Sequence, residues 1–197
     1  MAPLYGTQTG LREIVFTFDD GPHPVYTPKL LDTLTRSGVK AVFFVLGKNL
    51  ESEQGKAIIK RAFDEGHYIG NHTYSHANLT KLAEPQIREE IEKTQNLIGQ
   101  CSRGLKILRP PYGAHNDLVD KVARDLGYRL VFWNVDTLDW HPKYKSGGWV
   151  EHGMDQIRAR EDSIVLAHDI HRTTVEKVEE LIGGIKRLRS TSFAEFA

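Results

Sequence analysis

The sequence predicts an α/β protein in which buried, mostly parallel strands alternate with helices. Short apolar runs rich in β-branched and aromatic residues follow one another along the chain, and segments with apolar residues at helical spacing lie between them. The runs are 14–18, 41–46, 68–70, 105–108, 130–133 and 164–166. This alternation predicts a (β/α) barrel or an open α/β sheet, and both folds gather at one end the residues that follow the strands.

Three helices are indicated by their end signals. The first begins at Thr27-Pro28, which offers an N-cap and a proline at the first helical position, and ends at Gly38. The second opens at Pro85, and the third follows Thr173 and Glu176, which have the spacing of a capping box. Residues 190–197 are expected either to add a last strand or to fray at the end of the chain.

The length and composition favour one domain that spans residues 1–197. A chain of 197 residues can bury one core and is too short for two independent catalytic units. Its 26 basic and 26 acidic residues leave no net charge to attract nucleic acid. We therefore expect no nucleic-acid partner, and a monomer is the simplest expectation for the oligomeric state.

Membrane insertion and disulfide bonding are not expected either. No apolar run reaches the about 18 residues that a membrane-spanning helix needs. Residues 1–4 lack the basic start and apolar core of a signal peptide, although a signal or an upstream region can be missing from a sequence, so the compartment stays open. Cys101 is the only cysteine, which excludes an intramolecular disulfide.

Candidate metal ligands follow the first and third predicted strands. Asp19 and Asp20 leave the first strand as neighbours, so one carboxylate can hold a metal while the other faces a water molecule; the alternative is an ordinary Asp-Gly-Pro turn. His72 and His76 follow the third strand, and an i, i+4 pair on one helical turn would present both imidazoles to one point. Asp20, His72 and His76 would leave coordination positions open for water and substrate, as a catalytic zinc site requires.

Further polar residues follow the later strands. Arg109 lies in a stiff Pro-Pro segment, where it can pair with Asp19, and the backbone N–H of Tyr112 could stabilise an oxyanion. Asp139 could hold one ring nitrogen of His168 and make that histidine a competent general acid. Taken alone, the Arg109 segment also fits a Pro-Pro turn with a surface arginine, and a lone histidine at a strand end is usually just a hydrogen-bonded residue. The plainest role of Trp140 is to wall a pocket.

The five segments together resemble the motifs, in order, of the polysaccharide deacetylases of the NodB-homology type, carbohydrate esterase family 4. The segments are Thr17-Phe18-Asp19-Asp20-Gly21, His72-Thr73-Tyr74-Ser75-His76, Arg109-Pro110-Pro111-Tyr112, Asp136-Thr137-Leu138-Asp139-Trp140 and Leu166-Ala167-His168. They extend from residue 17 to residue 168, so the resemblance covers nearly the whole chain.

This resemblance implies a distorted (β/α) TIM-like barrel that removes acetyl groups from an acetylated glycan. The substrates would be N-acetylglucosamine units of chitin, chitooligosaccharides or peptidoglycan, or O-acetylated xylan, and such polymers suggest an extracytoplasmic or secreted enzyme. The implied roles are base for Asp19, metal ligands for Asp20, His72 and His76, and acid for His168. Arg109 would steady Asp19, Asp139 would tune His168, Tyr112 would supply the oxyanion N–H, and Leu166 and Trp140 would line the acetyl pocket.

The residues alone leave two other classes open. Two histidines and a carboxylate also form the iron site of non-haem oxygenases, and a requirement for oxygen and iron would identify that class. A non-catalytic glycan-binding module could use Trp140, Tyr112 and Tyr74 as a stacking platform, and it would bind glycan without releasing acetate. On general grounds zinc suits two imidazoles and one carboxylate best.

Overall fold

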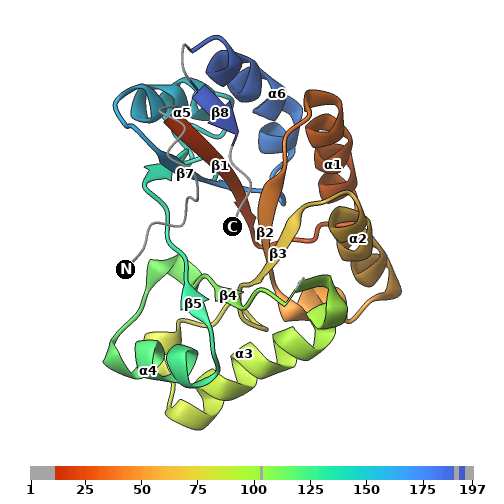
Figure 1. Cartoon of the computed structure of the whole chain (residues 1–197), viewed down its shortest axis with the longest axis vertical. Helices are drawn as coiled ribbons and strands as arrows, with labels where there is room; N and C mark the ends of the chain where they lie inside the picture. Colours follow the sequence, from red (N-terminus) through yellow and green to blue (C-terminus); the bar gives the residue numbers. More distant parts are fainter. Residues whose placement is uncertain (1–11, 103, 189–190, 194–197) are drawn as a thin grey trace. The chain divides into compact units, whose positions relative to one another are not determined.

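A computed structural model describes residues 12–102, 104–188 and 191–193 (Figure 1). The chain divides into two compact units, and each unit is built from separate stretches of the sequence. The terminal unit comprises Met1–Phe18, Val25–Val42 and Trp133–Ala197, and the central unit comprises Asp19–Pro24 and Phe43–Phe132.

The terminal unit carries the first strand and the last part of the chain. Its strands are β1 (Arg12–Asp19), β6 (Val135–Asp136), β7 (Ser163–His168) and β8 (Thr191–Phe193), and its helices are α1 (Tyr26–Ser37), α5 (Trp149–Arg158) and α6 (Arg172–Lys186). The strand order is β6-β7-β1, and β8 pairs with β1. The β6/β7 and β1/β8 pairs are parallel. Strand β1 ends at Asp19, which already belongs to the central unit.

The central unit carries the middle of the chain. Its strands are β2 (Ala41–Val45, from Phe43 onward), β3 (Tyr68–Asn71), β4 (Ile107–Leu108) and β5 (Arg129–Leu130), in the order β5-β4-β3-β2. Its helices are α2 (Glu53–Asp64), α3 (Glu84–Ile98) and α4 (Asp117–Asp125), and its 3-10 turns are η1 (Gly47–Leu50), η2 (Leu79–Lys81), η3 (Gly99–Ser102) and η4 (Pro111–Gly113). The β3/β4 and β4/β5 pairs are parallel, as the alternation of strands and helices predicts.

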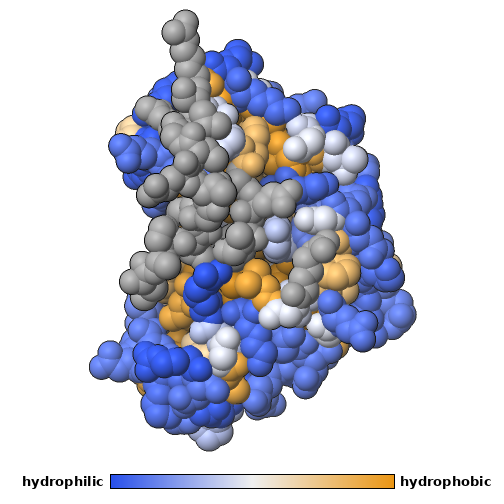
Figure 2. Space-filling view, in the orientation of Figure 1, coloured by the Kyte–Doolittle hydropathy of each residue, from blue (hydrophilic) through white to orange (hydrophobic). Residues whose placement is uncertain are grey.

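Each unit buries apolar residues of its own. In the central unit, α3 and α4 lie side by side (Figure 1) and share a core with η2 and β4. This core consists of Leu79, Ile87, Ile91, Leu108, Val119, Val122, Ala123 and Tyr128. In the terminal unit, α6 packs against α1 and α5, and Trp149 is fully buried. The surface over α3 and α4, at the lower edge of Figure 2, is mainly hydrophilic, as expected for helices that bury one face.

The strands occur close to where the sequence predicts them, with two differences in length. The runs 14–18, 41–46, 68–70 and 164–166 lie in or overlap β1, β2, β3 and β7, and the expected last strand is β8 over the described residues 191–193. The run 105–108 is a strand only at Ile107–Leu108. The run 130–133 leaves its strand after Leu130, and the carbonyl groups of Val131 and Phe132 accept hydrogen bonds from Arg109 instead.

Two predicted helix caps are wrong. Helix α1 begins at Tyr26, and the Thr27 hydroxyl donates to the buried carboxylate of Asp169 instead of capping the helix. Helix α6 begins at Arg172, so Thr173 lies inside it, and Glu176 pairs with Arg172. The predicted end at Gly38 is correct, since this residue adopts φ 65° and its N–H bonds back to the helix.

Among the helices of the described residues, none is long and apolar enough to cross a membrane.

We expect Ile91→Ala to lower the free energy of unfolding by about 2–5 kcal/mol, because Ile91 is fully buried in the core of the central unit. Urea unfolding followed by circular dichroism would measure this loss. The neighbouring exposed residue gives the control, Glu92→Ala, which should change stability by less than about 0.5 kcal/mol. A loss for Ile91→Ala no larger than that of the control would contradict the packing described.

Candidate functional site

Three strand ends in the central unit place the candidate metal ligands and their partners. Asp19 is the last residue of β1, and Asp20 follows it with φ 75°. His72 follows β3 directly, and Arg109 follows β4. The Asp20 backbone is held in place because Asn49 Nδ2 donates to its carbonyl oxygen over 2.8 Å.

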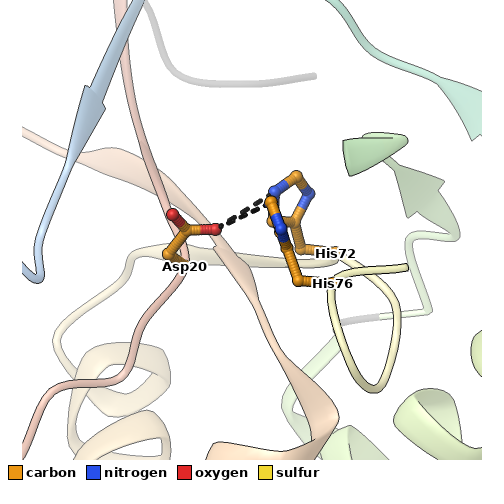
Figure 3. Close-up of side chains that lie close together, drawn as sticks. All are labelled: Asp20, His72 and His76. Carbon is orange, nitrogen blue, oxygen red and sulfur yellow. Dashed lines mark ion pairs between the residues drawn. The ribbon is translucent and has the colours of Figure 1, made fainter. Parts of the chain in front are cut away.

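Asp20, His72 and His76 converge on one point (Figure 3), which the sequence predicted. Asp20 Oδ1 lies 3.4 Å from His72 Nε2 and 3.3 Å from His76 Nε2. One ligand atom from each residue lies within 4.8 Å of the other two. Two imidazole nitrogens and one carboxylate oxygen fit a divalent transition metal and leave further coordination positions for other ligands.

The tautomer of His72 suits metal binding. Its Nδ1 lies 2.7 Å from the carbonyl oxygen of Arg109. Because a carbonyl oxygen only accepts hydrogen bonds, Nδ1 must carry the proton, and the lone pair of Nε2 is directed to the cluster. Such a hydrogen bond to the far ring nitrogen orients a metal-binding histidine.

The two histidines converge without lying on a helical turn, which corrects the geometry expected from their spacing. Residues 72–76 form a loop, in which Thr73 has φ 70° and His76 has φ 68°. The Thr73 N–H donates to Asn71 Oδ1, and the His76 N–H donates to Thr73 Oγ1. Left-handed conformations are costly for these residue types, so the surrounding contacts must maintain the loop.

His76 also contacts Tyr112. Its Nδ1 lies 3.2 Å from the Tyr112 hydroxyl, and the two ring centroids are 4.6 Å apart. Burial lowers the pKa of His76, and the nearby Asp20 carboxylate partly opposes this effect. The neutral imidazole, which is the form that binds metal, is therefore favoured near neutral pH.

A buried ion pair joins Asp19 to Arg109, as the sequence predicted. Arg109 Nη1 donates to Asp19 Oδ1 over 2.8 Å, and both side chains are almost completely buried. Burial lowers the pKa of the Arg109 guanidinium, and Asp19 opposes this effect. The other carboxylate oxygen, Asp19 Oδ2, lies 3.7 Å from His72 Nε2 and thus faces the metal ligands.

A second hydrogen-bonded pair lies in the terminal unit. His168 Nδ1 is 2.8 Å from Asp139 Oδ1, and Asp139 Oδ2 accepts hydrogen bonds from the His168 backbone and from Thr174 Oγ1. Burial acts to raise the pKa of Asp139, but these hydrogen bonds and the charge of His168 outweigh burial and lower it. An ionised Asp139 accepts the Nδ1 proton of His168, which leaves His168 Nε2 as the nitrogen for proton transfer.

The residues expected to contact the substrate differ in exposure: Tyr112, which was expected to supply the oxyanion N–H, and the two expected to line the acetyl pocket. Tyr112 is 67% exposed with φ 61°, Trp140 is 47% exposed, and Leu166 is buried in β7. A cavity of about 270 Å³ also opens in the central unit. Its lining includes Lys48 and Asn49, the residue that holds the Asp20 backbone.

The sequence did not identify four polar residues that support the site, because polar residues outside the motifs are indistinguishable from surface residues in one sequence. They are Asn49, Asn71, Glu90 and Thr174.

Fold and site together define a class: α/β proteins with parallel strands whose ends carry an open site of two histidines and one carboxylate. Residues 6–131 match the family model described as polysaccharide deacetylase. The chain belongs to this family. The predicted fold class is confirmed, because the chain matches a solved structure described as T48 deacetylase with substrate at 39% identity and a TM-score of 0.82, over 94% of this chain and 88% of that one.

Two curated relatives are named for different polymers. The chain is 40% identical to the peptidoglycan-N-acetylglucosamine deacetylase PgdA of Listeria monocytogenes over 176 residues. This match covers 89% of this chain and 36% of that protein. The chain is also 37% identical to a chitin deacetylase of Arthroderma benhamiae over 190 residues. This match covers 92% of this chain and 51% of that protein. The chain thus spans about a third to a half of the length of these relatives.

The lowered pKa of Asp139 predicts how stability depends on pH. The carboxyl pKa is lower in the folded state than its unfolded value of about 3.9. The ionised group therefore stabilises the fold fully above that value, and this contribution disappears as pH falls through the folded-state pKa. At pH 7, Asp139→Asn should cost about 1.5–3 kcal/mol.

Urea titrations between pH 5 and pH 3 would test this expectation. The difference between the wild type and Asp139→Asn should stay constant down to about pH 4 and narrow below it. The exposed Asp155 gives the control, Asp155→Asn, for which no such loss is expected at pH 7. A difference that widens as the pH falls below 4 would show that Asp139 is not stabilised in its ionised form.

Proposed function

We propose that this protein is a metal-dependent hydrolase that removes N-acetyl groups from N-acetylglucosamine units of chitin, chitooligosaccharides or peptidoglycan. The observation that carries the proposal is the convergence of Asp20, His72 and His76 beside the Asp19 carboxylate, in a chain of the polysaccharide deacetylase family. The chitin and peptidoglycan deacetylases among its relatives support both polymers. O-deacetylation of xylan is a further possible reaction of the same site.

The proposed cofactor is one divalent metal ion, zinc, held by Asp20 Oδ1 and by the Nε2 atoms of His72 and His76. When bound there, such an ion acts as a Lewis acid that polarises the acetyl carbonyl group and makes water more acidic. The hydrogen bond from His72 Nδ1 to the Arg109 carbonyl oxygen would keep that ring in its metal-binding orientation.

Asp19 is the proposed general base. Its Oδ1 is held by Arg109, and its Oδ2 faces the metal ligands, so Oδ2 is the oxygen available to accept a proton from the attacking water. Arg109 is always protonated and keeps the Asp19 carboxylate paired in its buried position.

The remaining roles complete the reaction. The Tyr112 N–H would stabilise the oxyanion that forms when water adds to the acetyl carbon. His168, oriented by Asp139, would donate the Nε2 proton to the sugar nitrogen as the C–N bond breaks, which yields acetate and a free amine. Trp140 and Leu166 would line the acetyl pocket.

Three broader proposals accompany this function. Residues 1–197 would form one NodB-homology domain, and the protein would work as a monomer. Its acetylated glycan substrate would place it outside the cytoplasm.

Chelation should abolish acetate release from N-acetylglucosamine oligomers, and added zinc should restore it, because the proposed reaction requires the metal. An enzymatic acetate assay on the chelated and the reconstituted protein would measure both effects. The assay should give the same result without oxygen, whereas activity that requires oxygen and iron would indicate the oxygenase class. Glycan binding without acetate release would indicate a binding module.

Asp19→Asn should lower the rate of acetate release by about a hundredfold or more, because the variant removes the general base. Zinc binding should persist, since the three metal ligands are unchanged. Titration of zinc and the steady-state rate would be measured on the same preparation, after circular dichroism has shown that it is folded. The control is Asp64→Asn, at an exposed aspartate. Full activity of Asp19→Asn would exclude Asp19 as the base.

A further inference from the structure

The loop that carries both metal-binding histidines has an unusual backbone. His72 is anchored by its position after β3, and its N–H donates to the Val45 carbonyl oxygen over 3.0 Å. His76 lies at the far end of the loop, where it is half-buried and has φ 68°. That conformation costs free energy for a residue other than glycine, so contacts must stabilise it, and Thr73 Oγ1 supplies one of them by accepting from the His76 N–H.

One side chain of helix α3 binds the middle of this loop through three hydrogen bonds. Glu90 Oε2 accepts from the backbone N–H groups of Tyr74 and Ser75, over 2.9 Å and 2.8 Å. Glu90 Oε1 accepts from the Ser75 hydroxyl over 2.7 Å. Two successive backbone N–H groups form a concave site that suits a carboxylate oxygen, and hydrogen bonds to an ionised acceptor are stronger than neutral ones.

The same helix supports the start of the loop independently of Glu90. Asn71 Nδ2 donates to the Ile91 carbonyl oxygen over 2.8 Å, and Asn71 Oδ1 accepts from the Thr73 N–H. Ile91 is anchored in the core of the central unit. Asn71 thus anchors the start of the loop. Residues 74–75, immediately before His76, are held by Glu90 together with η1, where the Lys48 N–H donates to the Tyr74 carbonyl oxygen over 3.0 Å.

We propose that Glu90 is a positioning residue of the metal site: its carboxylate holds the Tyr74-Ser75 backbone and so places His76 Nε2 beside Asp20. The inference rests on the proposed metal-dependent function. Glu90 lies on a different element from all three ligands and would act through the loop backbone, without contact with substrate.

Two substitutions separate hydrogen-bond geometry from charge. In Glu90→Ala, both backbone N–H groups and the Ser75 hydroxyl lose their acceptor. In Glu90→Gln, the amide oxygen can still accept from both N–H groups, and the amide NH₂ can donate to the Ser75 hydroxyl, so the contacts persist without the charge. Glu89→Ala is the matched control, because Glu89 is an exposed glutamate at the adjacent position of α3.

The measurement is a zinc titration of the full chain against a competing chelator, with the melting temperature and acetate release recorded on the same samples. Glu90→Ala should weaken zinc binding by roughly 10- to 100-fold, the usual effect of losing a residue that orients metal ligands. Its acetate release should fall at limiting zinc and recover largely at excess zinc. Glu90→Gln should bind zinc within about threefold of wild type, because its amide keeps all three contacts and the loop geometry, although each hydrogen bond is weaker without the charge.

The outcomes distinguish this inference from the proposed function. Wild-type zinc affinity in Glu90→Ala, or a defect equal to that of Glu89→Ala, would overturn the positioning role while the proposed function stands. A Glu90→Gln defect as large as that of Glu90→Ala would also overturn it, because charge and not backbone geometry would then be decisive. Failure of the wild type to bind zinc would refute both.

A shorter acid provides a second variant if Glu90→Ala does not fold. Glu90→Asp keeps the charge but shortens the side chain by one methylene group, so its carboxylate cannot reach all three donors at their present distances. Weakened zinc binding in Glu90→Asp, together with near-wild-type zinc binding in Glu90→Gln, supports the proposal. Wild-type affinity in Glu90→Asp contradicts it.

Discussion

The candidate site depends first on one buried ion pair, Arg109 with Asp19. A fully buried guanidinium is costly unless it is paired and hydrogen-bonded, and each nitrogen of Arg109 donates: Nε to the Val131 carbonyl oxygen, Nη1 to Asp19 and Nη2 to the Phe132 carbonyl oxygen. Its planar group also lies 4.2 Å from the centre of the Phe44 ring. The Arg109 side chain therefore connects the ends of β1, β4 and β5. The backbone carbonyl group of the same residue orients His72. Loss of the arginine would leave a buried carboxylate without its partner and release several parts of the site together.

The environments of two adjacent carboxylates explain why the same residue type is assigned two roles. Asp19 is almost completely buried, and one of its oxygens is committed to Arg109. Asp20 is less buried and turns Oδ1 toward both imidazoles. In an extended strand, successive side chains point to opposite faces. Asp20 departs from that geometry with φ 75°, and Asp19 Oδ2 and Asp20 Oδ1 both lie near His72 Nε2. The proposed metal ligand and the proposed base thus face the same histidine because the backbone turns between them.

Much of this organisation was predictable from the sequence, and the failures have physical causes. The site residues follow buried apolar strands, and parallel strands bring their ends together, so the clustering of Asp20, His72 and His76 followed from the order of the elements. Helix α5 was missed because Gly148 precedes it and Gly153 interrupts its helical pattern. That glycine is used for packing, since a Cβ there would lie 3.4 Å from the Thr137 methyl group and close to Leu181. Tertiary contacts of this kind leave no signal in local propensity.

The histidine pair shows how a correct prediction can follow from the wrong geometry. A spacing of four residues places two side chains on one face of a helix, but residues 72–76 form a loop with left-handed residues. Asn71 and Glu90 connect this loop to α3, and the Gly47 and Lys48 N–H groups connect it to η1. The His72 ring is held by the Arg109 carbonyl oxygen. The spacing alone therefore does not specify the site. We expect a chain with the same two histidines but without these contacts to keep the motif in its sequence and lose the convergence of both imidazoles with Asp20.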